Sequence, residues 1–170
     1  SDEGFGNDFL LPAGPLRESI DEIKKYDIAF INGEKKNRKL HYKIKYINKK
    51  IKIFEGKYEP KNLNKLNKKK KYYMFCGIGN PNEFINTLKK YKFNIKHKKI
   101  FPDHYKISSN EIKKIKEFSL KKNLDIITTE KDYFRLDRSE RKNINYLAVN
   151  LKINKINEFK KILASKLWKR

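Results

Sequence analysis

Short apolar runs alternate with amphipathic stretches through the second half of the chain. Runs of strand length lie at 72–76, 95–101, 124–128 and 145–151. Amphipathic stretches with apolar residues at helical spacing follow Pro81, follow Ser108 and occupy 156–168. Strands that alternate with helices in this way pack as a parallel sheet covered by the helices. The pattern therefore predicts a layered α/β lobe with a mostly parallel sheet.

Two of the expected helices carry clear start signals. Asn80 can cap the first helix with its side chain, and Pro81 suits the first helical position because proline lacks an N–H. Ser108 and Glu111 have the spacing of a capping box, in which each side chain accepts a hydrogen bond from the other residue's backbone. These signals predict where both helices begin.

The first half of the chain is less regular. Residues 16–26 place apolar residues at helical spacing, and the apolar run 28–31 predicts a short buried strand. Residues 40–58 alternate apolar and basic positions, which predicts a half-exposed, two-stranded β segment. Residues 60–71 are polar and rich in Lys and Asn, and we interpret them as a linker or surface loop.

The composition is strongly basic, with 43 Lys and Arg against 20 Asp and Glu and a net charge of +23. Such a charge favours anionic partners, including a nucleic acid or an anionic membrane surface. Only six of the basic residues are Arg, the residue that reads bases and phosphates with two parallel hydrogen bonds. We therefore keep a basic nucleic-acid-binding module as the alternative function class and do not expect a nucleic acid as the partner.

Other features of the composition exclude several classes of protein. A single cysteine, Cys76, excludes an internal disulfide framework and a zinc site built from several cysteines. No run reaches the length of about 20 apolar residues that a membrane-spanning helix needs. The N-terminus is acidic and lacks the apolar segment of a signal peptide. Cys76 lies inside an apolar run, so we expect a buried, unreactive thiol.

Polar residues concentrate where three expected strands end, in the segments GIGNP (77–81), FPDHY (101–105) and TTEKD (128–132). Ligands of parallel α/β sheets bind beyond the carboxyl ends of the strands, so we expect these loops to share one edge of one sheet. The backbone at Gly77, Gly79 and Asn80 could cradle a phosphate at a helix N-terminus. A glycine turn with a helix cap is the alternative interpretation.

The other two exit loops carry titratable side chains. His104 beside Asp103 could transfer a proton or orient a reacting group, whereas a purely structural or exposed histidine is the alternative. Glu130, Lys131 and Asp132 combine both charges in one loop, although acids are also common in the first turn of any helix.

The segment PAGPLRE (12–18) joins two prolines and a glycine to an Arg–Glu pair. Arg17 could bind a phosphate or carboxylate with two parallel hydrogen bonds. Glu18 could ligate Mg²⁺. The alternative is a surface salt bridge, which contributes little to stability.

Four strings occur along the chain in this order: GFGNDFLLPAGPLRES, MFCGIGNPNEFINTL, IFPDHYKIS and IITTEKDYFRL. In these strings and their order the chain resembles the tetraacyldisaccharide 4'-kinase (lipid A 4'-kinase) family. The resemblance implies transfer of the γ-phosphoryl group of ATP, with Mg²⁺, to the 4'-hydroxyl of the lipid A disaccharide 1-phosphate precursor. It also implies a peripheral location at the cytoplasmic face of the inner membrane of Gram-negative bacteria.

The same resemblance implies two α/β/α lobes joined by a two-stranded β linker. On this basis residues 1–39 end a preceding P-loop-type lobe, 40–71 form the linker and a basic loop, and 72–170 form the C-terminal α/β lobe. The family's Walker A loop, its DDG-type acidic motif and its catalytic aspartate precede the GFGN string and do not occur in this sequence. The chain therefore resembles the C-terminal half of such a kinase.

The resemblance also implies roles for individual residues. His104 corresponds to the catalytic histidine of the family, with Asp103 supporting it, while Tyr105 stands where the family often has a second histidine. Arg17 and Glu18 would line the phosphate and metal side of the cleft. Because phosphoryl transfer depends on a loop that holds the phosphates and Mg²⁺, we expect the isolated chain to be inactive and to bind neither ATP nor Mg²⁺ by itself.

Overall fold

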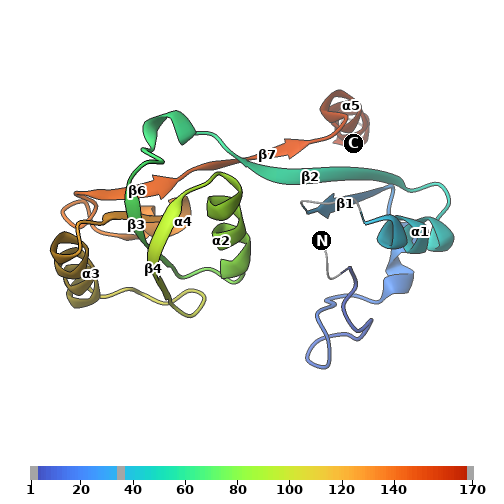
Figure 1. The fold of residues 1–170 in the computed structure, drawn as a ribbon. Helices are drawn as coiled ribbons and strands as arrows, with labels where there is room; N and C mark the ends of the chain where they lie inside the picture. The colour runs from blue at the N-terminus through green and yellow to red at the C-terminus, as the bar shows by residue number, and fades with distance from the viewer. Residues whose placement is uncertain (1–3, 34–36, 168–170) are drawn as a thin grey trace. The chain divides into compact units, whose positions relative to one another are not determined.

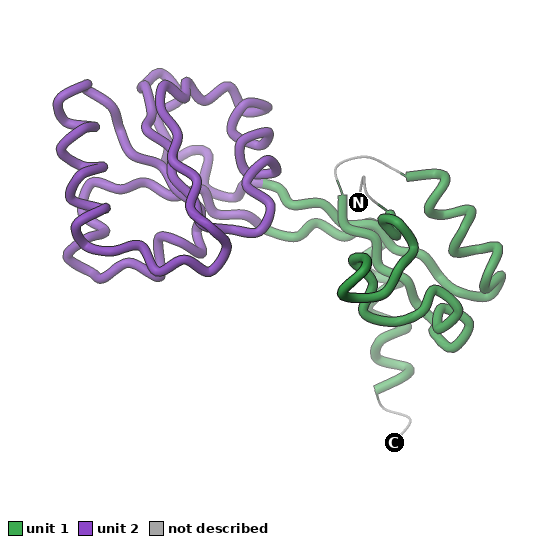
Figure 2. The backbone as a smooth tube through the Cα atoms, turned by 90° about the horizontal axis from the view of Figure 1, so that it is seen from below, with its two compact units in different colours: residues 1–59, 150–170 green, residues 60–149 purple. Residues whose placement is uncertain are grey.

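The computed structural model describes residues 4–33 and 37–167 of the chain. It divides into two compact units, residues 1–59 with 150–170 (unit 1) and residues 60–149 (unit 2), which Figure 2 shows in different colours. The sequence suggested an undivided C-terminal lobe over 72–170, whereas the structure groups residues 150–170 with unit 1.

Unit 2 is built on a four-stranded sheet in the order β4 (Asn94–Ile100), β3 (Lys71–Cys76), β5 (Asp125–Thr129) and β6 (Ile144–Leu147). Every neighbouring pair in this sheet is parallel. The mostly parallel sheet predicted from the alternation is therefore confirmed. A short 3-10 turn, η2 (Leu63–Lys65), precedes β3.

Helices cover both faces of the sheet (Figure 1). Successive side chains of a strand point to opposite faces, and in β3 Met74 packs in one hydrophobic cluster while Phe75 packs in another. Helix α2 (Pro81–Lys90) contributes to the first cluster, and α3 (Ser109–Lys121) contributes to the second. The lobe thus has three α/β/α layers, as the family resemblance implied.

Both helix starts are confirmed. The Asn80 side chain accepts a hydrogen bond from Glu83 N, and Pro81 opens α2. At α3 the Ser108 side chain accepts from Glu111 N, and the Glu111 carboxylate accepts from Ser108 N. The loops that follow β3 and β4 therefore end at Asn80 and Ser108, where α2 and α3 begin.

Unit 1 contains a three-stranded sheet in the order β1 (Ile28–Asn32), β2 (Lys52–Pro60) and β7 (Val149–Ile153). Strand β1 is parallel to β2. Hydrogen bonds from Lys61 N to Ala148 O and from Asn154 N to Glu55 O show that β7 runs antiparallel to β2. Three helical segments complete the unit: η1 (Ile20–Lys25), α1 (Arg38–Ile47) and α5 (Ile156–Leu167).

The predicted two-stranded β segment over 40–58 is wrong, because residues 38–47 form the helix α1. Residues two apart lie on opposite sides of a helix, whereas residues four apart share a side. Leu40 and Ile44 are therefore both buried, and Tyr42 and Tyr46 are both exposed. Residues 52–60 do form a strand, β2, but its partners in the sheet are β1 and β7, and residues 40–47 contribute no strand.

Two further boundaries differ from the prediction. The run 145–151 is divided between β6 and β7, which belong to different sheets, with the buried Ala148 between them. The helix predicted over 16–26 is reduced to the 3-10 segment η1, capped by Ser19. The final helix is confirmed over 156–167, and Trp168 lies outside the described residues.

Candidate active site

The three polar loops emerge from one edge of the parallel sheet. Strands β3, β4 and β5 are parallel neighbours, so their carboxyl ends lie together and the loops after Cys76, Ile100 and Thr129 meet there. Side-chain contacts join all three loops: Asp132 accepts from Gly77 N, and Lys131 contacts Asp103. The prediction that they share one edge is confirmed.

Asp132 is the buried anchor of this edge. It lies in the first turn of α4 (Glu130–Arg135), and its side chain is only 2% exposed. One carboxylate oxygen, Oδ2, accepts hydrogen bonds from Gly77 N (2.9 Å) and from Thr129 Oγ1 (2.7 Å). These contacts connect the loops after β3 and β5. A buried carboxylate needs such donors because burial without them is costly.

Asp103 and His104 occupy a tight turn after β4. Residue His104 has φ of 60°, in the left-handed region that side chains other than glycine seldom adopt. Asp103 Oδ1 accepts a hydrogen bond from His104 N (2.9 Å), which stabilises the turn. Lys131 Nζ lies 3.9 Å from the same oxygen, so the loop after β5 also contacts this turn.

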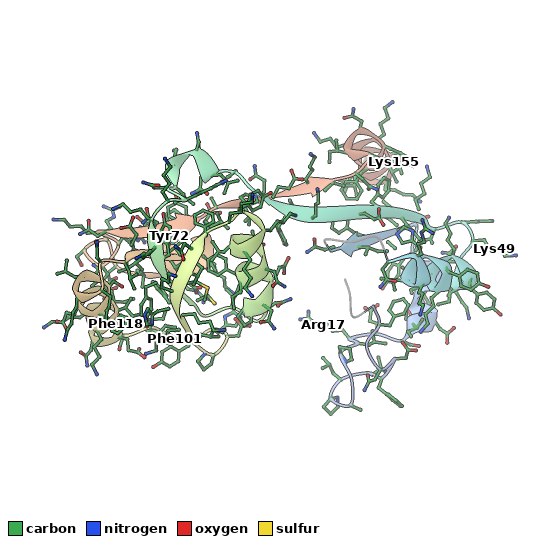
Figure 3. The ribbon with its side chains drawn as sticks, viewed as in Figure 1. Arg17, Lys49, Tyr72, Phe101, Phe118 and Lys155 are labelled. Atoms are coloured by element: carbon green, nitrogen blue, oxygen red, sulfur yellow. The ribbon has the colours of Figure 1, made fainter. Side chains whose placement is uncertain are left out.

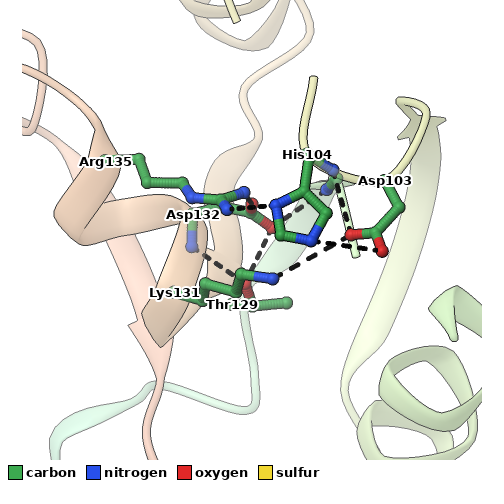
Figure 4. Close-up of polar contacts among 7 residues, drawn as sticks. Asp103, His104, Thr129, Lys131, Asp132 and Arg135 are labelled. Atoms are coloured by element: carbon green, nitrogen blue, oxygen red, sulfur yellow. Dashed lines mark hydrogen bonds and ion pairs between the residues drawn. The ribbon is translucent and has the colours of Figure 1, made fainter. Parts of the chain in front are cut away.

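Arg135 links the histidine to the buried anchor (Figure 4). Its Nη2 lies 3.1 Å from His104 Nδ1, and its Nη1 lies 3.7 Å from Asp132 Oδ1. His104 Nε2 lies 3.6 Å from Asp103 Oδ2. Two acids, two bases and an imidazole therefore meet at the carboxyl ends of β4 and β5.

The backbone of the glycine loop after β3 lies close to the Asp103 side chain. A Cβ atom at Gly79 would lie 3.0 Å from Asp103 Oδ2, so a larger residue would displace that carboxylate. The Gly77 N–H is already donated to Asp132, and Asn80 caps α2. In this structure Gly77 and Asn80 hold the site together, which matches the turn-and-cap interpretation of the loop.

A cavity of about 580 Å³ opens beside the cluster. His104, Asp132 and Arg135 line it together with residues from the start of α3 and the turn after α4: Tyr105, Lys106, Ile107, Ser108, Ser109, Leu136, Asp137 and Glu140. The lining offers hydrogen-bond donors, acceptors and the Tyr105 ring. Such a mixture suits a polar ligand with several hydroxyl groups.

Arg17 and Glu18 belong to unit 1, whereas all residues of the cluster belong to unit 2. Arg17 is exposed at the end of a loop that backbone hydrogen bonds between residues 9–11 and 14–16 hold together (Figure 3). The Glu18 carboxylate accepts a hydrogen bond from the Tyr26 hydroxyl. Within residues 4–33 and 37–167, no three metal-ligating side chains come together.

Comparison with known proteins decides the family. The model of the LpxK family, tetraacyldisaccharide-1-P 4'-kinase, matches residues 1–168. The chain belongs to this kinase family. It is 40% identical over 151 residues to the tetraacyldisaccharide 4'-kinase of Pelagibacter ubique and 38% identical over 170 residues to that of Rickettsia canadensis. These matches cover 88% and 98% of this chain and 48% of each relative, so the chain spans about half their length.

A solved structure of the kinase family agrees with the fold. The "apo" form of LpxK from Aquifex aeolicus, crystallised in complex with ATP, matches with a TM-score of 0.61 and 23% identity. The match covers 93% of this chain and 48% of that one. It supports the layered α/β architecture of this family member.

Sequence reasoning missed Arg135 in this cluster. The residue stands three positions after Asp132, one helical turn along α4, and this spacing was the available signal. The interpretation of 128–132 as a helix cap with first-turn acids is confirmed at Thr129, whose side chain accepts a hydrogen bond from Asp132 N. In the described part of the chain, no helix is long and apolar enough to cross a membrane.

Proposed function

We propose that this chain is the C-terminal portion of a kinase that transfers the γ-phosphoryl group of ATP to the 4'-hydroxyl of the lipid A disaccharide 1-phosphate precursor. The supporting observation is the cluster of Asp103, His104, Lys131, Asp132 and Arg135 at the strand exits of a chain that belongs to this family. In α/β folds this edge is where ligands bind.

The proposed chemistry divides between this chain and a P-loop lobe. The hydroxyl oxygen of the sugar forms a bond to the γ-phosphorus, the bond from that phosphorus to the leaving ADP oxygen breaks, and the hydroxyl proton passes to a base. ATP with Mg²⁺ supplies the phosphoryl group, and a P-loop holds the phosphates. The sequence has no Walker A motif. His104 pairs with an aspartate of the P-loop lobe and helps to activate the hydroxyl, and Asp103 supports it.

The remaining site residues take supporting roles in this proposal. Arg17 and Glu18 line the phosphate and metal side of the complete active site. Glu130, Lys131 and Asp132 lie on the substrate side, where Asp132 fixes the loops and Lys131 contacts Asp103. The cavity beside His104 receives the acceptor sugar.

An anionic membrane surface is the proposed location, at the cytoplasmic face of the bacterial inner membrane. The net charge of +23 supports it. Helix α1 adds a specific surface, because Tyr42 and Tyr46 are 71% and 77% exposed, stack on each other and lie among lysines. Tyrosine with lysine is typical of helices that lie at a membrane interface.

The kinase proposal is tested by complementation. The purified chain is incubated with ATP, Mg²⁺ and a lipid A disaccharide 1-phosphate, alone and with the P-loop lobe of a relative added as a separate polypeptide or by fusion. We expect phosphorylation only when that lobe is present. Turnover by the chain alone, free of contaminating kinase, would contradict the proposal that a P-loop lobe is needed to hold the phosphates. Absence of turnover in the fusion would contradict the proposed kinase function.

A further inference from the structure

We infer that Arg135 is a positioning residue for His104, which it holds by the Nδ1 atom so that the imidazole presents its Nε2–H to a carboxylate. The inference rests on the proposed role of His104 in the kinase, but its structural content concerns this chain alone. Nothing in the family comparison assigns a role to Arg135.

The contact between the two side chains decides the tautomer of the ring. A guanidinium has hydrogen-bond donors and no acceptor. Arg135 Nη2, 3.1 Å from His104 Nδ1, therefore donates to that nitrogen. A neutral imidazole carries one proton, so the proton is on Nε2. The Nε2–H faces Asp103, whose Oδ2 lies 3.6 Å away.

Arg135 is itself fixed from the protein interior. Its Nη1 lies 3.7 Å from Oδ1 of the buried Asp132. The other oxygen of that carboxylate accepts hydrogen bonds from Gly77 N and Thr129 Oγ1. Because a guanidinium is planar and rigid, its contact with Asp132 sets the direction in which Nη2 meets the imidazole. A continuous set of contacts therefore runs from the β3 exit to the histidine ring (Figure 4).

The histidine needs such support because little else surrounds it. Its side chain is 72% exposed. Its backbone has φ of 60° and is stabilised by the hydrogen bond from His104 N to Asp103 Oδ1. An exposed imidazole without a partner changes rotamer freely. Arg135 and Asp103 thus contact the two ring nitrogens of a side chain that packing does not restrain.

This geometry changes what His104 does in the proposed reaction. A neutral imidazole accepts a proton only at its unprotonated nitrogen, and here that nitrogen is engaged by Arg135. His104 then acts as a hydrogen-bond donor through Nε2, which faces Asp103 in this structure and would face the aspartate of the P-loop lobe in the proposed kinase. Arg135 keeps the histidine in this donor form.

Chemical modification of this chain tests the contact without any kinase activity. Diethyl pyrocarbonate acylates the unprotonated nitrogen of imidazole, and mass spectrometry of peptides gives a separate rate for each histidine. We expect Arg135→Ala to raise the rate at His104 by roughly 2- to 10-fold, the ratio expected when one hydrogen bond is lost. Arg135→Lys keeps a cationic donor and should stay closer to wild type. The rates at His41 and His97 should not change.

Control variants distinguish a specific effect on the position of His104 from a general destabilisation of the fold. Arg138→Ala removes an arginine three residues further along, which makes no hydrogen bond to His104 in the described structure, and should leave the rate at His104 unchanged. The buried Cys76 should stay unreactive towards a thiol reagent wherever the sheet is intact. The inference is wrong if His104 is modified at the same rate in wild type and in Arg135→Ala. It is also wrong if His104 reacts faster in Arg135→Lys than in Arg135→Ala, or if the rates at all three histidines rise equally. Complementation by the P-loop lobe is a separate result, so failure of the kinase proposal remains distinguishable.

Discussion

His104 and His97 differ in their surroundings although both are exposed. His104 lies in the strand-exit cluster, whereas His97 lies within β4, stacked on Tyr73 and packed against Phe118. In a complete kinase that contains this chain, we expect His104→Ala to lower kcat by about 10²–10⁴-fold and to change KM little. A group that acts in the transition state affects kcat more than substrate binding.

His97→Ala is the matched control for that prediction. It should leave kcat near wild type, and any loss should appear as lower stability because aromatic contacts are removed. The measurement is kcat per folded molecule, with the folded fraction taken from circular dichroism. Equal kcat values for the two variants would remove His104 from the mechanism.

Cys76 makes the stability depend on pH in the alkaline range. Burial, and then the nearby charge of Asp132, raise the pKa of its thiol from 9.0 to about 11. Between these values the unfolded chain loses the thiol proton and the folded chain keeps it, so the free energy of unfolding falls as pH rises. We expect a loss of roughly 2–3 kcal/mol from this thiol between about pH 9 and about pH 11.

Urea denaturation of wild type and Cys76→Ala at several pH values measures this effect. Near neutral pH the variant is less stable because a methyl group replaces the larger thiol side chain, but its free energy of unfolding should fall less steeply above pH 9.0. Burial also raises the pKa of Tyr72, so some slope remains in the variant. Parallel curves for the two proteins would show that the thiol titrates alike in the folded and unfolded chain.

At the scale of single elements, the capping box of α3 is an independent source of stability. Ser108 Oγ accepts from Glu111 N at 3.3 Å, and Glu111 Oε2 accepts from Ser108 N at 3.0 Å. Ser108→Ala should lower the free energy of unfolding by about 0.5–2 kcal/mol. Ser109→Ala, one residue later inside the helix, should be neutral or slightly stabilising because alanine favours helices. A similar loss in both variants would contradict a specific role for the cap.

The exposed face of α1 leads to a prediction about membrane binding. The chain should sediment with vesicles that contain anionic phosphatidylglycerol and not with neutral phosphatidylcholine vesicles, and added salt should weaken binding. Replacement of Tyr42 and Tyr46 by Ser should weaken binding on the order of tenfold, since their rings would leave the interface. Tyr58→Ser, on β2 and 40% exposed, is the control.

The vesicle results separate two parts of the proposal. If wild type fails to bind anionic vesicles, the proposed membrane partner is wrong. If wild type binds and the double tyrosine variant binds equally well, the surface lies elsewhere on the chain. Tight, salt-sensitive binding to DNA in place of vesicles would favour the nucleic-acid alternative.

At the scale of the whole molecule, the two units have cores of unequal size. Among the described residues, the hydrophobic cluster of unit 1 contains four buried residues, Ile31, Leu40, Ile44 and Ile51, whereas unit 2 has clusters of nine and seven. Opening free energies follow the apolar surface that an element buries. Native-state hydrogen exchange should therefore be slower for amides of β3 and β5 than for those of β1 and β2. A single opening free energy across both units would contradict this.

The sequence by itself determined the strands β3, β4 and β5, the helices α2 and α3, and the edge at which polar residues meet. Apolar runs of strand length and local caps such as Ser108 with Glu111 act within a few residues, so they can be interpreted without knowledge of the fold. Parallel strands place their carboxyl ends together, and this rule alone predicted that Asp103, His104 and Asp132 would lie near one another.

Only the tertiary structure decided α1, the division of 145–151 and the role of Arg135. The spacing of Leu40, Tyr42, Ile44 and Tyr46 suits a strand or a helix, and burial of Leu40 with Ile44 against the core of unit 1 selected the helix. The division at Ala148 follows from pairing of β7 with β2, a contact between residues far apart in the chain. Arg135 acquired its partners because β4 and β5 end beside each other, and sequence spacing cannot show which side chains meet across two strands.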